Sequence, residues 1–192
     1  MTEAPGTHNP QFLPSDIPAP QDDGGARHLT GAKLPDIALP TTDGTAINLS
    51  RLKGRTVVYI YPRTGVPGVD PPDGWDQIPG ARGCTPQSCS FRDNLAELKR
   101  LGVAQLFGLS TQDTDYQKEA ATRLHLPFAI LSDEKLALTR ALNLPTFSTA
   151  GMRTRNLKST LAAMIIEARP STLAAPPMSF FISSMPLAGL MS

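Results

Sequence analysis

The run Val57-Val58-Tyr59-Ile60-Tyr61, followed at once by Pro62, is the most strand-like stretch of the chain. It is continuously β-branched and aromatic, which is the pattern of a strand buried on both faces. Residues 103–110 and 127–131 have the same apolar character, and helical patterns separate these runs from one another. This order predicts βαβ units and therefore an open α/β sandwich, in which helices flank a largely parallel central sheet.

A helix is predicted after each of these runs. The first starts with Thr85 as N-cap and Pro86 at the first helical position, and it continues to Leu101 before Gly102, a usual helix stop. The same kinds of signal predict helices over residues 114–124 and 133–142, extended segments over 34–39 and 46–49 around an Asp43-Gly44 turn, and a strand or helix over 161–166.

The composition divides the chain into one domain and two tails. Residues 1–28 are rich in Pro, Asp and Gly and have too few apolar side chains to offset the entropy of ordering, so a flexible tail is predicted. The domain is predicted over residues 29–166, with a Gly- and Pro-rich insertion at 65–82 whose length makes it a candidate functional loop. Residues 167–192 form an atypical C-terminal segment with no charged residue after Arg169.

Charge and hydropathy exclude two classes of partner. Lys and Arg number 18 against 17 Asp and Glu, a formal net charge of +1, which lacks the basic excess of a nucleic-acid-binding protein. No apolar stretch reaches the ~20 residues needed to cross a bilayer, and the N-terminus lacks the apolar core of a signal peptide. We therefore expect a cytoplasmic protein with no nucleic-acid or membrane partner.

The two cysteines, Cys84 and Cys89, lie across the predicted start of the first helix. The partial positive charge of a helix N-terminus stabilises a thiolate, and Arg82 adds to it, so Cys84 is predicted to be more acidic than a free cysteine. The residues alone leave open the alternative that Cys84 is a small buried hydrophobic side chain. A zinc site is disfavoured, because the three histidines show no ligand spacing around this single cysteine pair.

Helix geometry separates the two cysteines. Residues five apart in an α-helix lie about 7.5 Å apart along its axis and about 140° apart around it. Their Cα atoms are then beyond the ~7 Å limit for a disulfide. A bond between Cys84 and Cys89 therefore requires the first turn to unwind.

Several motifs in order resemble the peroxiredoxins, and within them the bacterioferritin-comigratory-protein type. A strand ending Tyr61-Pro62 is followed by Gly-Cys84-Thr-x-x-x-Cys89-x-Phe-Arg-Asp93, which opens an amphipathic helix. Upstream, the segment Gly31-x-x-Leu-Pro-Asp and, downstream, residues 126–133 also match. The resemblance extends from about Lys33 to Pro145.

The resemblance implies a thioredoxin-like fold, with a mixed central sheet flanked by helices, and a thiol peroxidase that needs no metal or other cofactor. Cys84 would be the peroxidatic cysteine, which attacks a hydroperoxide and becomes a sulfenic acid. Cys89 would resolve it to a disulfide, which a thioredoxin-type or glutaredoxin-type dithiol reduces. A monomer or homodimer is expected.

The chain departs from the family pattern at two places. About twenty residues separate Pro62 from Cys84, and Ala81 stands where the family has a Thr or Ser hydroxyl. The substrate-binding candidates are therefore Pro62, Thr64, Thr85 and, from a C-terminal stretch that matches only loosely, Arg153. These departures keep open an alternative function, a catalytically weak thioredoxin-fold redox sensor or binding module.

Overall fold

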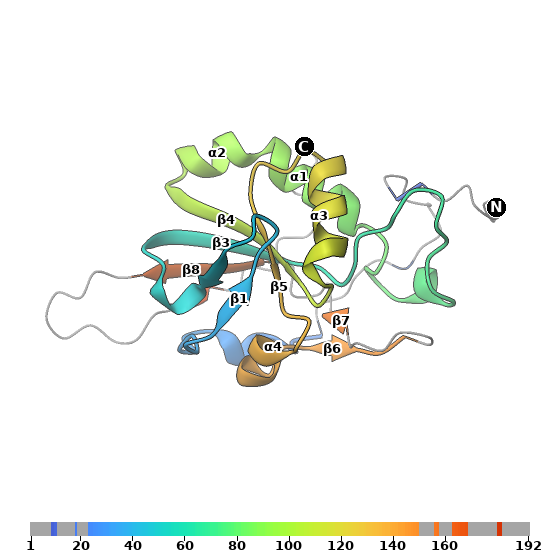
Figure 1. The fold of residues 1–192 in the computed structure, drawn as a ribbon. Helices are drawn as coiled ribbons and strands as arrows, with labels where there is room; N and C mark the ends of the chain where they lie inside the picture. The colour runs from blue at the N-terminus through green and yellow to red at the C-terminus, as the bar shows by residue number, and fades with distance from the viewer. Residues whose placement is uncertain are drawn as a thin grey trace, which may run out of the picture.

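The structure, a computed structural model, describes residues 9–10, 18, 23–149, 156–157, 163–168 and 180–181. Its centre is a five-stranded sheet in the order β5-β4-β3-β8-β9 (Figure 1). The strands are β3 (Gly54–Ile60), β4 (Val103–Ser110), β5 (Ile130–Ser132), β8 (Ala163–Ala168) and β9 (Phe180–Phe181). β3, β4 and β5 pair in parallel, whereas β8 pairs antiparallel with both β3 and β9, so the sheet is mixed rather than largely parallel.

The strand β3 and the residue after it divide their side chains between the two faces of the sheet. Because successive residues of a strand point to opposite faces, Val57, Tyr59 and Tyr61 join one hydrophobic cluster and Val58 and Ile60 join the other. All five side chains are buried. The prediction of a strand buried on both faces is confirmed.

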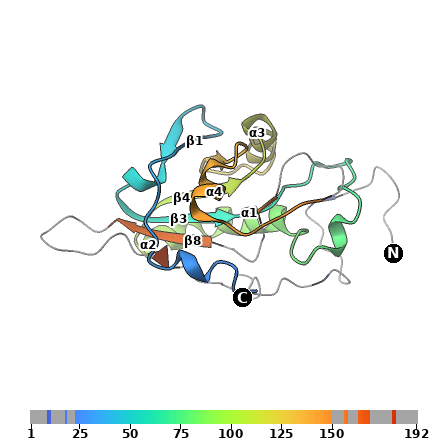
Figure 2. The ribbon, with the colours of Figure 1, turned by 90° about the horizontal axis from the view of Figure 1, so that it is seen from below.

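Each face of the sheet is covered by its own set of elements (Figures 1 and 2). One face carries α1 (Cys84–Asp93), α2 (Leu95–Arg100) and α3 (Thr114–Arg123). The other carries α4 (Ala137–Leu142), the 3-10 turns η1 (Arg27–Leu29) and η2 (Leu49–Arg51), and the hairpin of β1 (Ala38–Pro40) and β2 (Ala46–Asn48). The short strands β6 (Thr146–Phe147) and β7 (Asn156–Leu157) pair with each other, and the turn η3 (Trp75–Gln77) lies in the insertion.

The first helix differs from its prediction at both ends. Gly83, at φ 113°, is the N-cap in place of Thr85, so Cys84 rather than Pro86 is the first helical residue. This left-handed conformation favours glycine, which has no Cβ to clash. The predicted continuous helix to Leu101 is also wrong, because Asn94 separates α1 from α2 and its amide donates to the Ser90 carbonyl over 2.9 Å.

Three further predicted elements differ in extent or type. The strand predicted over 127–131 begins only at Ile130. The helix predicted over 133–142 begins only at Ala137. Asp133 lies before the helix, and its carboxylate accepts the Thr139 backbone N–H of the first turn over 2.7 Å. The ambiguous segment 161–166 contains a strand, β8, next to the central strand β3.

The proposed tails, 1–28 and 167–192, and the candidate Arg153 lie largely or wholly outside the described residues. Within the part of the chain that is described, no helix has both the length and the apolar character needed to cross a membrane.

Candidate active site

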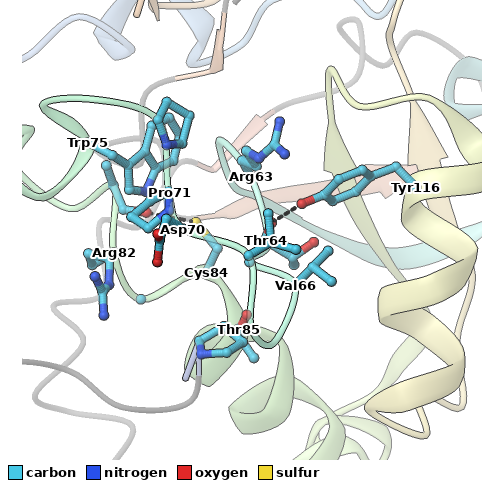
Figure 3. Close-up of a pocket in the computed structure, with 16 residues that line it drawn as sticks. Arg63, Thr64, Val66, Asp70, Pro71, Trp75, Arg82, Cys84, Thr85 and Tyr116 are labelled. Carbon is cyan, nitrogen blue, oxygen red and sulfur yellow. Dashed lines mark hydrogen bonds between the residues drawn. The ribbon is translucent and has the colours of Figure 1, made fainter. Parts of the chain in front are cut away.

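A small pocket lies where the chain leaves β3 and where α1 begins. Its volume of about 30 Å³ is enough for about two water molecules. Figure 3 shows Cys84 between Pro71 and Trp75 of the insertion on one side and Arg63 and Thr64 on the other. The fold therefore brings the insertion, the segment after β3 and the start of α1 together around one thiol.

The Cys84 thiol is buried and protonated in this pocket. Its side chain is 3% exposed, and it donates a hydrogen bond to the Ala81 carbonyl over 3.3 Å. Burial raises the pKa of Cys84 to about 12, although the backbone N–H groups of Arg63 and of Cys84 itself act in the opposite direction. The prediction of an acidic thiol is wrong for this state. The free-energy cost of removing a thiolate from water exceeds the stabilisation that the helix N-terminus provides.

Arg82 does not supply the positive charge expected beside Cys84. Its guanidinium pairs with Asp76, at 2.8 Å, within the insertion. Figure 3 shows the Arg82 side chain directed away from the Cys84 sulfur. This ion pair joins two residues of the insertion, so the Arg82 charge is directed to Asp76 and not to the Cys84 thiol.

Because the pKa of Cys84 is raised in the folded protein, we expect the free energy of unfolding to fall at alkaline pH. Above the ordinary value of 9.0, the unfolded thiol loses its proton while the folded thiol keeps it, so folding stability falls as pH rises toward about 12. In reducing conditions, urea unfolding should show wild type losing up to about 1.4 kcal/mol per pH unit relative to Cys84→Ala. Cys89→Ala is the control and should follow wild type. Parallel curves for wild type and Cys84→Ala would contradict a raised pKa.

Two threonine hydroxyls line the pocket, and they differ in their partners. Thr64 donates its backbone N–H to Gln112 Oε1 over 3.2 Å, and its hydroxyl lies 3.5 Å from the same oxygen. Thr85 is 2% exposed, and its hydroxyl has no hydrogen-bond partner among the described residues. A buried hydroxyl without a partner is costly, so Thr85 is the better candidate to bind a polar ligand.

The remaining predicted substrate residues are not gathered here. Pro62, the second residue after β3, is buried but does not line the pocket, and Arg153 lies outside the described residues. A cation that the sequence reasoning missed, Arg63, does line it, with its guanidinium carbon 4.6 Å from the centroid of the Tyr116 ring. Its position directly after Pro62 was the available signal. Tyr116 in turn donates to the Thr64 carbonyl over 2.9 Å, which fixes this segment (Figure 3).

The second cysteine lies further along the same helix. Cys89 is half-buried in α1, and both thiols are free. Arg92, three residues further along α1, donates to the Asp93 carboxylate over 2.7 Å and to the Leu124 carbonyl over 2.7 Å. Within the described segments, no group of three His, Cys, Asp or Glu side chains is placed to hold a metal ion.

A mixed sheet whose central strand leads to a helix beginning at a buried cysteine defines a thioredoxin-like thiol protein. The Redoxin family matches residues 29–168, and the chain belongs to this family, as a peroxiredoxin of the peroxiredoxin Q and Bcp type. The predicted fold class and resemblance are confirmed, and the alternative of a weak redox sensor or binding module is not favoured.

The relatives support this assignment at moderate identity. Chloroplastic peroxiredoxin Q of Oryza sativa subsp. japonica is 39% identical over 105 residues, 54% of this chain and 41% of that protein. Chloroplastic peroxiredoxin Q of Sedum lineare is 30% identical over 141 residues, 73% of this chain and 67% of that protein. Peroxiredoxin Bcp of Escherichia coli K12 is 37% identical over 105 residues, 54% and 57% of the two chains. The chain thus spans less than half the length of the rice relative.

Solved structures show the same fold at lower identity. Peroxidoxin BcpB of Mycobacterium tuberculosis superposes with a TM-score of 0.58 at 20% identity, covering 84% of this chain and 90% of that one. Peroxiredoxin Q of Xanthomonas campestris superposes with a TM-score of 0.57 at 19% identity, covering 83% and 90%.

Proposed function

We propose that this chain is a thiol-dependent peroxidase that reduces hydrogen peroxide or organic hydroperoxides. The observation that carries the proposal is the buried Cys84 thiol at the first position of α1, inside a pocket of about 30 Å³. The sulfur attacks the distal peroxide oxygen, the O–O bond breaks, and the thiol proton ends on the departing water or alcohol. Cys84 is left as a sulfenic acid.

We further propose that Cys89 completes the cycle. Its thiol attacks the Cys84 sulfur, the S–O bond breaks, an S–S bond forms, and the hydroxyl leaves as water. A thioredoxin-type or glutaredoxin-type dithiol then reduces the disulfide, so both thiols are free again at the end of each turnover. The bacterioferritin comigratory protein of Xanthomonas campestris, whose solved structure is similar to this chain, has alkyl peroxide reduction activity, which supports this class of substrate.

The proposed substrate residues are Pro62, Thr64, Thr85 and Arg153. In the resting pocket the Cys84 proton is held by the Ala81 carbonyl, an acceptor that favours the neutral thiol. A bound hydroperoxide offers this proton a different acceptor, its own departing oxygen. The Thr85 hydroxyl and the Arg63 backbone N–H are the donors placed to hold the peroxide and the forming thiolate.

Removing the Thr85 hydroxyl tests the proposed binding role. Thr85→Val keeps the shape of the side chain, so we expect about tenfold slower reaction of Cys84 with peroxide and a gain of about 1 kcal/mol in folding stability. The gain follows because a buried hydroxyl without a partner is removed. Stopped-flow oxidation and urea unfolding measure the two effects, with Thr64→Val as the matched variant. An unchanged rate in Thr85→Val with a slowed Thr64→Val would transfer the role to Thr64.

Three further points belong to this proposal. We propose a cytoplasmic location, because the reducing conditions of the cytoplasm return the two cysteines to the thiol form between turnovers. The domain limits 29–166 are supported by the similar extent of the Redoxin match, and we place the insertion 65–82 inside this domain. We propose a monomer or homodimer that has no nucleic-acid or membrane partner, in keeping with the net charge of +1.

A further inference from the structure

The first turn of α1 is tied to the central sheet by two consecutive buried hydrogen bonds. The Tyr59 hydroxyl, from β3, donates to Ser88 Oγ over 3.2 Å. Ser88 Oγ in turn donates to the backbone carbonyl of Cys84 over 2.9 Å. Tyr59 and Ser88 are both fully buried. The pair, called here the Tyr59–Ser88 latch, therefore acts on the backbone of the candidate peroxidatic cysteine.

The Tyr59 side chain is held in place from several sides. Its ring stacks on Phe91 with the centroids 4.5 Å apart, and Phe128 meets it edge-on. Gly108 of the neighbouring strand β4 leaves room for the hydroxyl, since a Cβ there would lie only 2.7 Å from the Tyr59 oxygen. Burial raises the pKa of Tyr59 above its ordinary value, so the hydroxyl remains a donor at physiological pH.

The latch exists only while α1 is wound as far as Cys84. A bond between Cys84 and Cys89 requires this turn to unwind, because residues five apart in a helix are too distant for a disulfide. Ser88 lies between the two cysteines, so unwinding that brings Cys84 to Cys89 displaces it and breaks both its bond to the Cys84 carbonyl and its bond from Tyr59. The two hydrogen bonds therefore oppose the step that brings the cysteines together.

We propose that Tyr59 and Ser88 are positioning residues that set the rate of disulfide formation and, through it, the fate of the Cys84 sulfenic acid. This inference rests on the proposed peroxidase function. Before resolution, the sulfenic sulfur can attack a second hydroperoxide, whose O–O bond breaks to give water or alcohol and a Cys84 sulfinic acid. A tighter latch slows resolution and increases the fraction lost to this overoxidation.

Tyr59→Phe tests the latch, because it keeps the ring and its stacking and removes only the hydroxyl. Losing one buried neutral hydrogen bond should make disulfide formation about fivefold faster. At a fixed peroxide concentration the ratio of sulfinic acid to disulfide should fall by about the same factor, while the first oxidation of Cys84 keeps its rate. The single Trp75, which is 4% exposed and lines the pocket, provides a fluorescence signal for both steps in stopped flow. Mass spectrometry measures the sulfinic acid.

Two comparisons separate the latch from general loosening of the fold. Tyr61→Phe removes a neighbouring buried hydroxyl that has no partner among the described residues, and it should leave both rates unchanged. In a Ser88→Ala background, Tyr59→Phe should no longer speed disulfide formation, because the link to Cys84 is already absent.

The outcomes also distinguish the latch from the function on which it rests. Normal Cys84 oxidation with an unchanged disulfide rate in Tyr59→Phe would overturn the latch alone. Acceleration that persists in the Ser88→Ala background, or that Tyr61→Phe reproduces, would overturn it as well. A wild-type chain in which peroxide does not oxidise Cys84 at all would overturn the proposed function and the latch with it.

Discussion

Replacing Cys84 with Ser is expected to slow peroxide reduction by at least about 10³-fold, the scale on which enzymes lose activity with their covalent nucleophile. Ser fits the space of the thiol but is a far weaker nucleophile toward peroxide oxygen. Cys89 does not replace it, because Cys89 lies outside the residues that line the pocket. Stopped-flow consumption of hydrogen peroxide and of a small alkyl hydroperoxide measures the effect.

The Cys84→Ser variant should remain folded, which its circular dichroism and the emission of Trp75 will show. Cys89→Ser serves as the matched control, since it removes the other thiol and should retain a normal first oxidation. Equal rates for wild type and Cys84→Ser would exclude Cys84 as the peroxidatic residue.

Replacing Cys89 with Ser is expected to allow one turnover and then stop the cycle. One equivalent of peroxide should be consumed at the wild-type rate, after which the Cys84 sulfenic acid accumulates without an intramolecular partner. Turnover coupled to a thioredoxin-type reductant should fall at least about 10²-fold, because an external thiol lacks the effective concentration of a cysteine on the same helix. A reagent specific for sulfenic acids should label Cys84.

The same experiment separates resolution by Cys89 from other routes. Sustained turnover by Cys89→Ser alone would show that the sulfenic acid is reduced without Cys89. If Cys89→Ser stops after one turnover, mixing it with Cys84→Ser chains tests whether Cys89 acts within its own chain, because return of turnover in the mixture would show resolution by the Cys89 of a second chain.

Local patterns were sufficient to predict most of the architecture. The run of residues 57–61 could be identified as a two-face buried strand because burial on both sides leaves no alternation in its sequence. The Thr85-Pro86 signal placed the start of α1 two residues too late, because the actual N-cap is Gly83 in a left-handed conformation. The strand β8 was ambiguous because a short apolar run is compatible with either type of structure.

The chemical properties of the site depend on contacts between distant residues, which local patterns do not contain. The helix N-terminus predicted an acidic Cys84, but the insertion packs over the thiol, and the resulting burial raises its pKa to about 12. Likewise, Arg82 is drawn to Asp76 rather than to the thiol. The hydrogen bond from Tyr59 to Ser88 joins residues 29 positions apart, so no periodicity reveals it.

Peptide mapping of the wild-type chain after one equivalent of hydroperoxide tests the proposed redox couple most directly. Both cysteines lie between Arg82 and Arg92, so trypsin releases them on a single peptide, residues 83–92. We predict that this peptide resists alkylation and is lighter by two hydrogen atoms, as an internal Cys84–Cys89 disulfide requires. Recovery of the peptide with both cysteines alkylated, or only as a disulfide between two chains, would contradict the proposed mechanism.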